Sequence, residues 1–379
     1  MPATSDSLTL GVEEEFLLVD PDDGRLVPRV EEVIANLESS WPNRIEREMN
    51  RCQVELSTTV HRSLTDLEAE LVLRREDLAG AAAAAGCAIL PTATHPFSSA
   101  AEQQVRREEP RFDAMWERYR LIAEQQVVCG AHFHVRMGDR DTDVRVARIL
   151  RPWLPVLLAL SANSPFWEGQ DTGYASFRSE VWLRWPTAGF PPPLDDAAAF
   201  ERHVAQLVEA EVVADSSYLY WYLRPSMVHP TLECRVVDIP LHTEDTVTLA
   251  GLYRGLAAAA MDGALPDPDA PSDLLDAAMW RAGRYGLQER LLDPLALRPV
   301  PAAEVVDTTL GAARDALVRH GDLDRVTTGV QQILERGTGS ERQRRLAETA
   351  PDGQLVRELR TDAGAQRALP AATGASPTG

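Results

Sequence analysis

The stretch GVEEEF (residues 11–16) decides the fold of this chain. Successive side chains of a β-strand point to opposite faces of the sheet. Glu13 and Glu15 therefore share one face, while Val12 and Phe16 point the other way. We predict a strand over residues 8–19 that has one apolar face and one face carrying carboxylates.

The same spacing of polar residues recurs in two later stretches. His132 and His134 stand two apart in CGAHFHV (residues 129–135), and Glu233 and Arg235 stand two apart in TLECRV (residues 231–236). Strands predicted over residues 126–137 and 231–239 would project each pair from a single face.

A fourth polar face is predicted from a hairpin. Strands expected over residues 44–49 and 52–57 flank the turn Asn50-Arg51. With a two-residue turn, Glu48 faces Gln53, and Glu55 lies two positions further along the same face. Diagonal neighbours across such a pair are ~7–8 Å apart, so two carboxylates can hold a metal ion between them.

Together these stretches put glutamates, histidines and an arginine on polar strand faces. Crowded carboxylates repel one another and cannot all stay ionised without cations. Oxygen-rich sets with an imidazole suit Mg²⁺ or Mn²⁺ better than zinc, and Mg²⁺ held this way keeps positions open for phosphate oxygens. The sequence contains neither GxGxxG nor GxxxxGK[ST]. Metals and arginines would therefore have to hold the phosphates of any bound ATP.

Each feature taken alone has a simpler interpretation. A lone GVEEEF is more often an edge strand with a solvated face, and a lone His132 is more often a hydrogen-bonded core histidine. Glu233 and Arg235 alone could form a surface ion pair worth ~0–1 kcal/mol. The functional interpretation gains weight because the pattern recurs in four places.

Composition excludes several classes of partner. The chain has 379 residues and a formal net charge of −20, which disfavours non-specific binding of nucleic acid or anionic membrane. Its first residues lack the features of a signal peptide, and no apolar stretch reaches the ~18 residues of a membrane span. The four cysteines stand singly, as expected for reduced core thiols. We predict a cytoplasmic protein.

The remaining chain is predicted to be mostly helical. Helical patterns cover residues 63–85, 142–162, 195–213, 243–262, 272–285, 302–319 and 322–335. Because no strand pattern follows residue 265, residues 265–350 are interpreted as a helical extension of one domain spanning residues 1–350. Gly, Ala, Thr and Pro accumulate after that point, so residues 351–379 are predicted to be a disordered tail.

A series of motifs occurs in a fixed order along the chain. They are GVEEEF (11–16), VELST (54–58), THP (94–96), GAHFHV (130–135), NSPFW (163–167), SFR with RWP (176–178, 184–186) and TLECR (231–235). The ordered set resembles the glutamate–cysteine ligase type 2 family of carboxylate–amine ligases, over roughly residues 8–345.

The resemblance implies an α+β, glutamine-synthetase-like catalytic domain, with a curved antiparallel sheet whose polar face binds metal and nucleotide and with helices behind. It implies an ATP-dependent ligase that activates a carboxylate as an acyl phosphate, which an amine attacks to give an amide, γ-glutamyl in a glutamate–cysteine ligase. The implied metal ligands are Glu13, Glu15, Glu48, Glu55, His132 and Glu233. Arg235 would lie beside the transferred phosphate and act in catalysis with Glu55, while Arg178 and Arg184 would bind substrate carboxylate or phosphate.

Two other classes of function stay open at this point. A metal-dependent amide hydrolase needs carboxylates and histidines but no phosphate-binding arginines, so Arg178, Arg184 and Arg235 count against it. A catalytically silent nucleotide- or amino-acid-binding protein would have no need of the full ligand set. The sequence reveals neither the acid nor the amine, and it leaves a homo-oligomer open. Aromatic residues in 167–193 and 218–224 either line an amine pocket or pack in the core.

Overall fold

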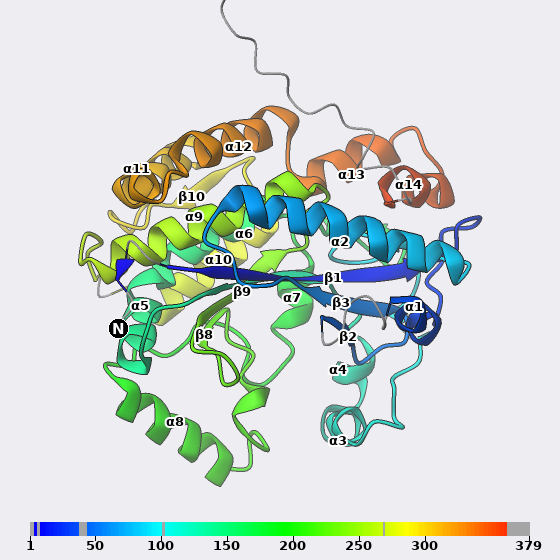
Figure 1. Cartoon of the computed structure of the whole chain (residues 1–379), viewed down its shortest axis with the longest axis horizontal. Coiled ribbons are helices and arrows are strands. Elements are labelled where there is room, and N and C mark those ends of the chain that lie inside the picture. Colours follow the sequence, from blue (N-terminus) through cyan, green and yellow to red (C-terminus); the bar gives the residue numbers. More distant parts are fainter. Residues whose placement is uncertain (1–3, 6–7, 38–43, 101–102, 268–269, 362–379) are drawn as a thin grey trace, which may run out of the picture.

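The computed structural model describes residues 4–5, 8–37, 44–100, 103–267 and 270–361. A seven-stranded antiparallel sheet runs through its middle (Figure 1). Six strands follow the order β2-β3-β1-β5-β9-β8, and β4 pairs with β1. Their bounds are Ile45–Arg47 (β2), Gln53–Ser57 (β3), Leu10–Val19 (β1), Gly130–Val135 (β5), Leu232–Asp238 (β9), Leu223–Pro225 (β8) and Ala88–Leu90 (β4).

Helices cover one face of this sheet. The inner helices are α2 (Leu64–Ala84), α6 (Leu154–Ser161) and α9 (Thr243–Met261) (Figure 1). Val12 and Phe16 of β1 are buried on this side, as their alternation with the glutamates predicts. The helical layer therefore takes the apolar face of β1, and the carboxylate-bearing face is turned the other way.

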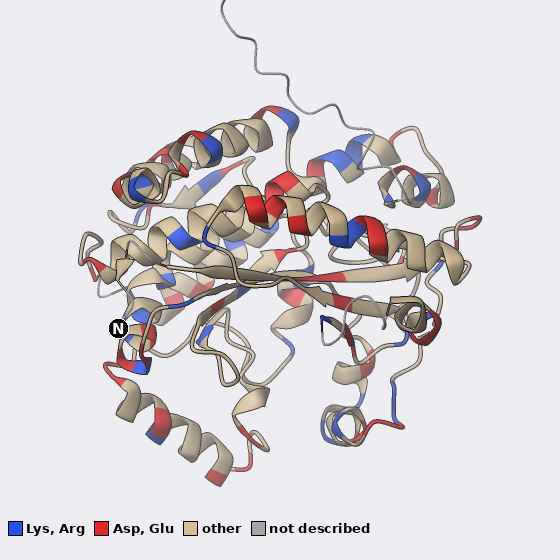
Figure 2. Cartoon of the chain, viewed as in Figure 1, with Lys and Arg blue, Asp and Glu red and all other residues tan. Residues whose placement is uncertain are grey.

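A second row of helices covers α9. Helices α11 (Ala302–His320) and α12 (Leu323–Arg336) pack on its outer side, which explains why α9 is buried over most of its length. Acidic and basic residues both occur on the outer surfaces of α2, α11 and α12 (Figure 2). None of the helices in the described ranges is long and apolar enough to cross a membrane.

The other elements connect or flank these layers. They are α1 (Val30–Leu37), α3 (Pro110–Tyr119), α4 (Leu121–Glu124), α5 (Arg140–Leu150), η3 (Arg151–Trp153), β6 (Phe166–Trp167), β7 (Gln170–Asp171), α7 (Arg178–Trp182), α8 (Ala197–Glu209), η4 (Ser216–Tyr218), α10 (Ser272–Tyr285), β10 (Arg290–Leu292), β11 (Pro299–Pro301), α13 (Gly339–Ala347) and α14 (Asp352–Leu359).

The four strands that carry the polar faces are confirmed, and so is the hairpin register. Glu46 lies opposite Glu55 and Arg47 opposite Val54, which is the predicted register. The turn differs from the prediction, because β2 ends at Arg47 and the backbone N–H of Gln53 donates to Asn50 O at 3.1 Å, which places Arg51 and Cys52 at the tip. The helix predicted over residues 142–162 is interrupted by the 3₁₀ turn η3. Prolines at the starts of η3 and α6 cannot donate the hydrogen bonds of a continuous helix.

The prediction of a wholly helical segment after residue 265 is wrong in one place. Strands β10 and β11 form a two-stranded sheet there, with Arg290 paired to Pro301 and Leu292 to Pro299. Each strand has only three residues, and β11 has proline at both ends. So short a segment shows no alternation of polar and apolar residues.

The predicted start of the tail is also wrong. Helix α14 follows Pro351 directly and buries Leu355, Val356 and Leu359 against the body of the protein. Thr361 then forms a β-bridge with Ile89. Three apolar residues on one face of a short helix were enough to dock it, although the composition around it suggested disorder. The rest of the predicted tail, residues 362–379, lies outside the described residues.

Candidate active site

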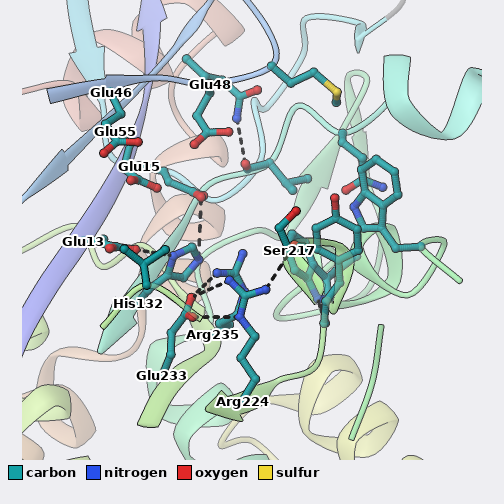
Figure 3. A pocket seen from close by; sticks show the side chains of 18 of the residues that line it. Glu13, Glu15, Glu46, Glu48, Glu55, His132, Ser217, Arg224, Glu233 and Arg235 are labelled. Carbon is teal, nitrogen blue, oxygen red and sulfur yellow. Dashed lines mark hydrogen bonds and ion pairs between the residues drawn. The ribbon is translucent and has the colours of Figure 1, made fainter. Parts of the chain in front are cut away.

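A cavity of about 300 Å³ opens on the carboxylate-bearing face of the sheet (Figure 3). Seven residues singled out from the sequence line it: Glu13, Glu15, Glu48, Glu55, His132, Glu233 and Arg235. They come from β1, β3, β5, β9 and the turn after β2. Strand alternation therefore brought together residues that lie up to two hundred positions apart in the chain.

The pairing of strands fixes how these side chains meet. Glu13 of β1 lies directly opposite His132 of β5, and Glu15 lies directly opposite Glu55 of β3. Glu55 in turn lies opposite Glu46 of β2. Directly opposed residues have Cβ atoms ~4.5–5.5 Å apart, where like charges destabilise the sheet. Three carboxylates in a row across three strands are costly unless cations join them.

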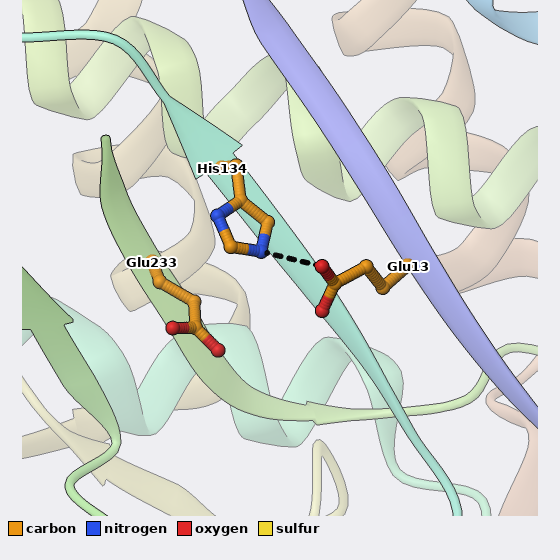
Figure 4. A group of neighbouring side chains, drawn as sticks. All are labelled: Glu13, His134 and Glu233. Atoms are coloured by element: carbon orange, nitrogen blue, oxygen red, sulfur yellow. Dashed lines mark ion pairs between the residues drawn. The ribbon is translucent and has the colours of Figure 1, made fainter. Parts of the chain in front are cut away.

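Three overlapping sets of side chains have the geometry of cation sites. In each set, one ligand atom per residue lies within 4.8 Å of the others. The sets are Glu13–His134–Glu233 (Figure 4), Glu13–His132–Glu55 and Glu15–Glu48–Glu55. The donors are carboxylate oxygens with at most one imidazole, which fits Mg²⁺ or Mn²⁺.

Burial and like charge act together on the innermost carboxyls. Burial, reinforced by the charge of Glu15, raises the pKa of Glu48 to about 8. Burial and the charges of Glu13 and Glu48 raise the pKa of Glu55 well above its ordinary value. Both carboxyls therefore tend to hold protons at neutral pH when no cation is bound, and a cation has to displace those protons.

Glu13 lies between two imidazoles and behaves differently. His132 Nδ1 lies 3.2 Å from Glu13 Oε2, and His134 Nε2 lies 3.2 Å from Glu13 Oε1. Burial alone would raise the pKa of Glu13, but His134 and His132 outweigh it and lower the pKa below its ordinary value. Glu13 is therefore the carboxylate most ready to bind a cation without losing a proton.

Glu233 is held by two arginines. Arg224 Nε lies 2.9 Å from Glu233 Oε2, and Arg235 donates to Glu233 Oε1 (Figure 3). Burial alone would raise the pKa of Glu233, but Arg235 and Arg224 outweigh it and hold the pKa well below its ordinary value. One carboxylate facing two guanidinium groups leaves a net positive charge at this end of the cavity, which suits an anionic phosphate or carboxylate.

A β-bulge in β9 lies next to Arg235. Ala131 pairs with Val237 and Phe133 with Cys234, so two residues of β9 stand opposite His132 alone. The extra residue shifts the alternation and turns Asp238 to the polar side, where Arg178 lies 3.7 Å from it. Bulges beside active sites commonly re-aim side chains in this way.

Arg178 is not among the described residues that line the cavity. It is buried and donates to the carbonyl oxygens of Arg235 and Val236. Its guanidinium covers Gly130, where a Cβ atom would come 2.2 Å from Nη2. The close approach explains the glycine at this position, and the predicted contact of Arg178 with substrate has no support from its placement.

Arg184 also lies apart from the residues that line the cavity. Its Nη1 donates to Gln125 Oε1 at 2.7 Å, and its guanidinium lies 6.0 Å from the ring centre of Trp167. Arg224 and the exposed Arg111 of α3 line the cavity, whereas Arg178 and Arg184 do not. Neither Arg224 nor Arg111 showed a strand pattern, because β8 has three residues and ends in proline, and Arg111 begins a helix.

Further residues of the cavity had weaker signals in the sequence. His134 shares a face with His132, as the spacing predicted, but only the structure places it against Glu13 and Glu233. Trp182, Trp185 and Tyr220 form an aromatic wall, with Trp185 stacked on Tyr220 at 4.8 Å between ring centres. These aromatic residues pack in the core and also line the cavity, and their use as an amine pocket stays a prediction.

An antiparallel sheet has helices on one face and, on the other, an acidic cavity with candidate cation ligands beside two arginines, an arrangement that fits an ATP-dependent ligase of the carboxylate–amine class. The chain belongs to glutamate-cysteine ligase family 2 (GCS2), whose family model matches residues 9–362. The family resemblance and the enzyme class predicted from the motifs are thereby confirmed.

Relatives of known sequence cover nearly the whole chain. A protein of Salinispora arenicola, provisionally named glutamate–cysteine ligase 2, is 41% identical over 344 residues, which is 90% of each chain. One from Saccharopolyspora erythraea, provisionally named glutamate–cysteine ligase 2-2, is 41% identical over 94% of this chain and 93% of its own.

Two solved structures share the fold. The glutamate–cysteine ligase of Francisella tularensis in complex with AMP matches with a TM-score of 0.73 at 13% identity, over 95% of this chain and 88% of that one. A bifunctional glutathione synthetase from Pasteurella multocida matches with a TM-score of 0.71 at 17% identity, over 94% of this chain and 52% of that one. The predicted α+β fold is confirmed.

Proposed function

We propose that this ligase uses ATP with Mg²⁺ or Mn²⁺ to join the carboxylate of an amino acid to an amine. The names of its relatives make glutamate and cysteine the first pair to test, with a γ-glutamyl amide as product. Family membership supports amide-bond formation and leaves the amide hydrolase and the silent binding protein without support.

One observation carries the proposal. The three sets of candidate cation ligands share members, because Glu13 belongs to two sets and Glu55 to two. They therefore form one continuous row, from the Glu48 end of the cavity to Glu233 beside Arg235. A row of this kind matches a polyphosphate better than it matches one isolated metal.

The acidic residues and the arginine of the cavity have different proposed roles. Glu13, Glu15, Glu48, Glu55, His132, His134 and Glu233 would hold the cations. Bound Mg²⁺ supplies positive charge that offsets the repulsion between a carboxylate and the γ-phosphate. Arg235 is held by its hydrogen bond to Glu233 and by Trp182, whose ring centre lies 5.3 Å from its guanidinium carbon. Its guanidinium would stabilise the phosphate during transfer.

The reaction then needs no protein nucleophile. The substrate carboxylate attacks the γ-phosphorus, ADP leaves, and an acyl phosphate forms. The amine attacks the acyl carbon, loses a proton, and expels inorganic phosphate to give the amide. Trp182, Trp185 and Tyr220 line the end of the cavity by Arg235 and would shield the acyl phosphate from water.

A screen of amino-acid and amine pairs for ADP release tests the proposal. Purified protein with Mg²⁺–ATP should release ADP only when a matching acid and amine are both present, and mass spectrometry should find the amide. Amide hydrolysis without ATP, or ADP release without any amide, would contradict the assignment.

ATP binding should also depend on a divalent cation. Without Mg²⁺, ATP would meet the ionised Glu13 and would find no metal to join its phosphates to Glu48 and Glu55, which hold protons when no cation is bound. Calorimetry with ATP before and after chelation of Mg²⁺ measures this directly. Equal affinity in both conditions would show that no metal bridges the protein and the phosphates.

Three further predictions belong to the same proposal. The ligase acts in the cytoplasm and does not bind nucleic acid, in keeping with its net charge of −20. Its catalytic unit is a single domain that begins at the N-terminus and, because α14 is docked, continues to about residue 361 rather than 350. Sedimentation of the purified protein would decide whether it forms a homo-oligomer.

A further inference from the structure

A second cavity, of about 470 Å³, lies beside the one that holds the reaction centre. It is formed by the segment 183–192, η3, α10, the residue before β8, and His203 of α8. The residues that matter for its chemistry are Arg151, Phe190, Tyr222, Ser272, Asp276 and Met279. None of them lines the first cavity, so its chemistry is separate from that of the ligase reaction.

Arg151 brings a buried positive charge to this cavity. Only 5% of the residue is exposed. Its Nη2 donates to Ser272 Oγ at 2.8 Å, and its guanidinium lies 5.9 Å from the ring centre of Phe190. Its Nε–H is buried and makes no hydrogen bond with any residue that the structure describes. A buried donor without an acceptor is costly, and an anionic oxygen in the cavity would relieve that cost.

Tyr222 and Asp276 add further polar groups. Tyr222 is 3% exposed, and its hydroxyl is buried without a hydrogen-bond partner in the described part of the chain. Asp276, on the exposed side of α10, acts electrostatically on Arg151. The cavity therefore offers a cation and an anion to the same occupant, with the phenol oxygen of Tyr222 buried beneath its wall.

Apolar side chains form the rest of the wall. Phe190, two prolines after it, and Met279 surround the polar groups. A few convergent polar groups in a mostly apolar pocket of this volume are typical of a small-molecule site. A ligand that satisfies all of them has a carboxylate for Arg151, an ammonium group for Asp276, and a short apolar body.

We infer that this cavity is a second binding site for a free α-amino acid with an apolar side chain. The carboxylate pairs with the guanidinium of Arg151, and the ammonium group faces Asp276. The side chain lies on Phe190 and Met279. Recognition at this site requires neither ATP nor a divalent cation, because the site holds its own charged partners.

The two cavities share a wall, so a test has to tell them apart. Tyr222 lies between Tyr220 and Arg224, which line the first cavity, and its backbone N–H donates to Gly189 of the second at 2.7 Å. Methionines provide separate reporters. Met49 and Met115 line the first cavity, and Met279 lines the second.

The experiment titrates the full chain, labelled with ¹³C at the methionine methyl groups, with L-leucine in the absence of ATP and Mg²⁺. The Met279 resonance, assigned with Met279→Leu, should shift and saturate with a dissociation constant of ~1 mM. L-leucinamide lacks the carboxylate and 4-methylpentanoate lacks the ammonium group, so each should bind about tenfold more weakly, the loss of one good charged contact.

Two variants on α10 provide a matched pair. Asp276→Asn should weaken leucine binding about tenfold. Asp273→Asn, on the same helix and not among the residues lining the cavity, should leave it unchanged. Because Asp276 is exposed, neither substitution threatens the fold. Arg151→Gln, checked first for an unchanged melting temperature, should abolish the shift.

Three results would overturn the inference. One is the absence of a saturable Met279 shift with leucine. Another is an undiminished Met279 shift when leucine is added to Asp276→Asn and when leucinamide is added to the parent protein. That result would show that the cavity binds only the apolar part of the ligand. The third is a shift confined to Met49 and Met115, which would place leucine in the reaction centre.

Discussion

The two sides of β1 treat neighbouring carboxylates in opposite ways. Glu14 points into the helical layer and is fully buried. Arg75 Nε lies 2.8 Å from one of its oxygens, and the hydroxyl of Thr246 donates to the other at 2.7 Å. Glu13 and Glu15, one position away on either side, face a cavity with more carboxylates than cations.

The difference shows how to separate structure from function in a run of acidic residues. The Glu14–Arg75 pair is closed: Arg75 also donates to the carbonyl oxygens of Pro240 and Leu241, so it ties α2 and the start of α9 to the sheet. The cavity carboxyls are open, because no arginine pairs with Glu15, Glu48 or Glu55 within the described residues, and Glu48 and Glu55 hold protons until a cation binds. Unbalanced buried charge costs stability, and proteins keep it where a ligand completes the balance.

The largest effect should come from the open side. Glu55→Gln removes a member of two cation sets, so ADP release should fall by at least ~10³-fold as cation positions are lost. The metal-free protein should melt at about the same temperature, because glutamine resembles the protonated form that Glu55 takes when no cation is bound. Initial rates with Mg²⁺–ATP and thermal melts of the chelated protein measure both effects.

Glu46→Gln is the control for that experiment. Glu46 lies opposite Glu55 and lines the same cavity but belongs to none of the three cation sets. It should keep most of the activity. A lower melting temperature for Glu55→Gln with activity retained would show that Glu55 is a structural residue and would erase the difference between the two sides of β1.

The closed side should show the reverse pattern. Glu14→Gln leaves Arg75 buried with its charge unbalanced, which should lower the free energy of unfolding by ~3–5 kcal/mol. The folded fraction should keep its turnover, since Glu14 points away from the cavity. Urea titration measures the free energy of unfolding, and a separate activity assay at low temperature, where the variant is folded, measures its turnover. Stability within error of the parent protein would refute the view that this pair braces the fold.

Arg235 should show a smaller, purely kinetic effect. Its planar guanidinium is held by Glu233 and suits phosphate oxygens, whereas lysine offers a point charge. Arg235→Lys should keep most of the affinity for Mg²⁺–ATP but lose ~10²-fold in turnover. Calorimetry and ADP release on one preparation separate the two quantities.

Arg47→Lys is the matched change for Arg235→Lys. Arg47 also lines the cavity, yet its Nε is bonded to the exposed Glu31 at 2.9 Å. It should alter turnover little. If Arg235→Lys lowers the melting temperature and leaves turnover intact, Arg235 only braces Glu233.

Much of this contrast could be predicted from the sequence, because strand alternation depends on the chain alone. The spacing of Glu13 and Glu15, of His132 and His134, and of Glu233 and Arg235 was enough to assign each pair to a polar face. The register of β2 and β3 was predicted correctly, although the turn lies at Arg51 and Cys52 and not at Asn50 and Arg51. In a long strand with one apolar face, the alternation of residues shows which side chains point to the core and which point away from it.

Other parts depend on contacts that the sequence does not display. Arg224 and Arg111 reach the cavity from a three-residue strand and a helix start, where no period exists to assign a face. Arg178 looked like a ligand-binding residue because its motif implied it. The bulge in β9 and the glycine at position 130 give it a buried place against Asp238. Such placements arise from tertiary packing.

The smallest effect concerns the pH dependence of stability in the metal-free protein. The pKa of Glu48 is raised in the folded state to about 8, from 4.5 in the unfolded chain. The folded state therefore holds its proton more tightly, and the free energy of unfolding should fall as pH rises from about 4.5 to about 8.

Asp143 supplies the internal comparison. It lies in α5, away from the cavity, and burial raises its pKa to about 7, so it lowers stability over a similar pH range. Only the cavity carboxyls Glu48 and Glu55 should respond to Mg²⁺, because the cation replaces their protons and leaves Asp143 untouched. Between pH 5 and 8 the melting temperature of the chelated protein should fall by roughly 2–5 °C more than that of the Mg²⁺-bound protein. Glu48→Gln should remove the Glu48 share of that excess and leave the Glu55 share, whereas Asp143→Asn should flatten both curves equally. If Glu48→Gln leaves the excess in place, Glu48 does not carry the proton that the cation displaces, and the open side of β1 is balanced in some other way.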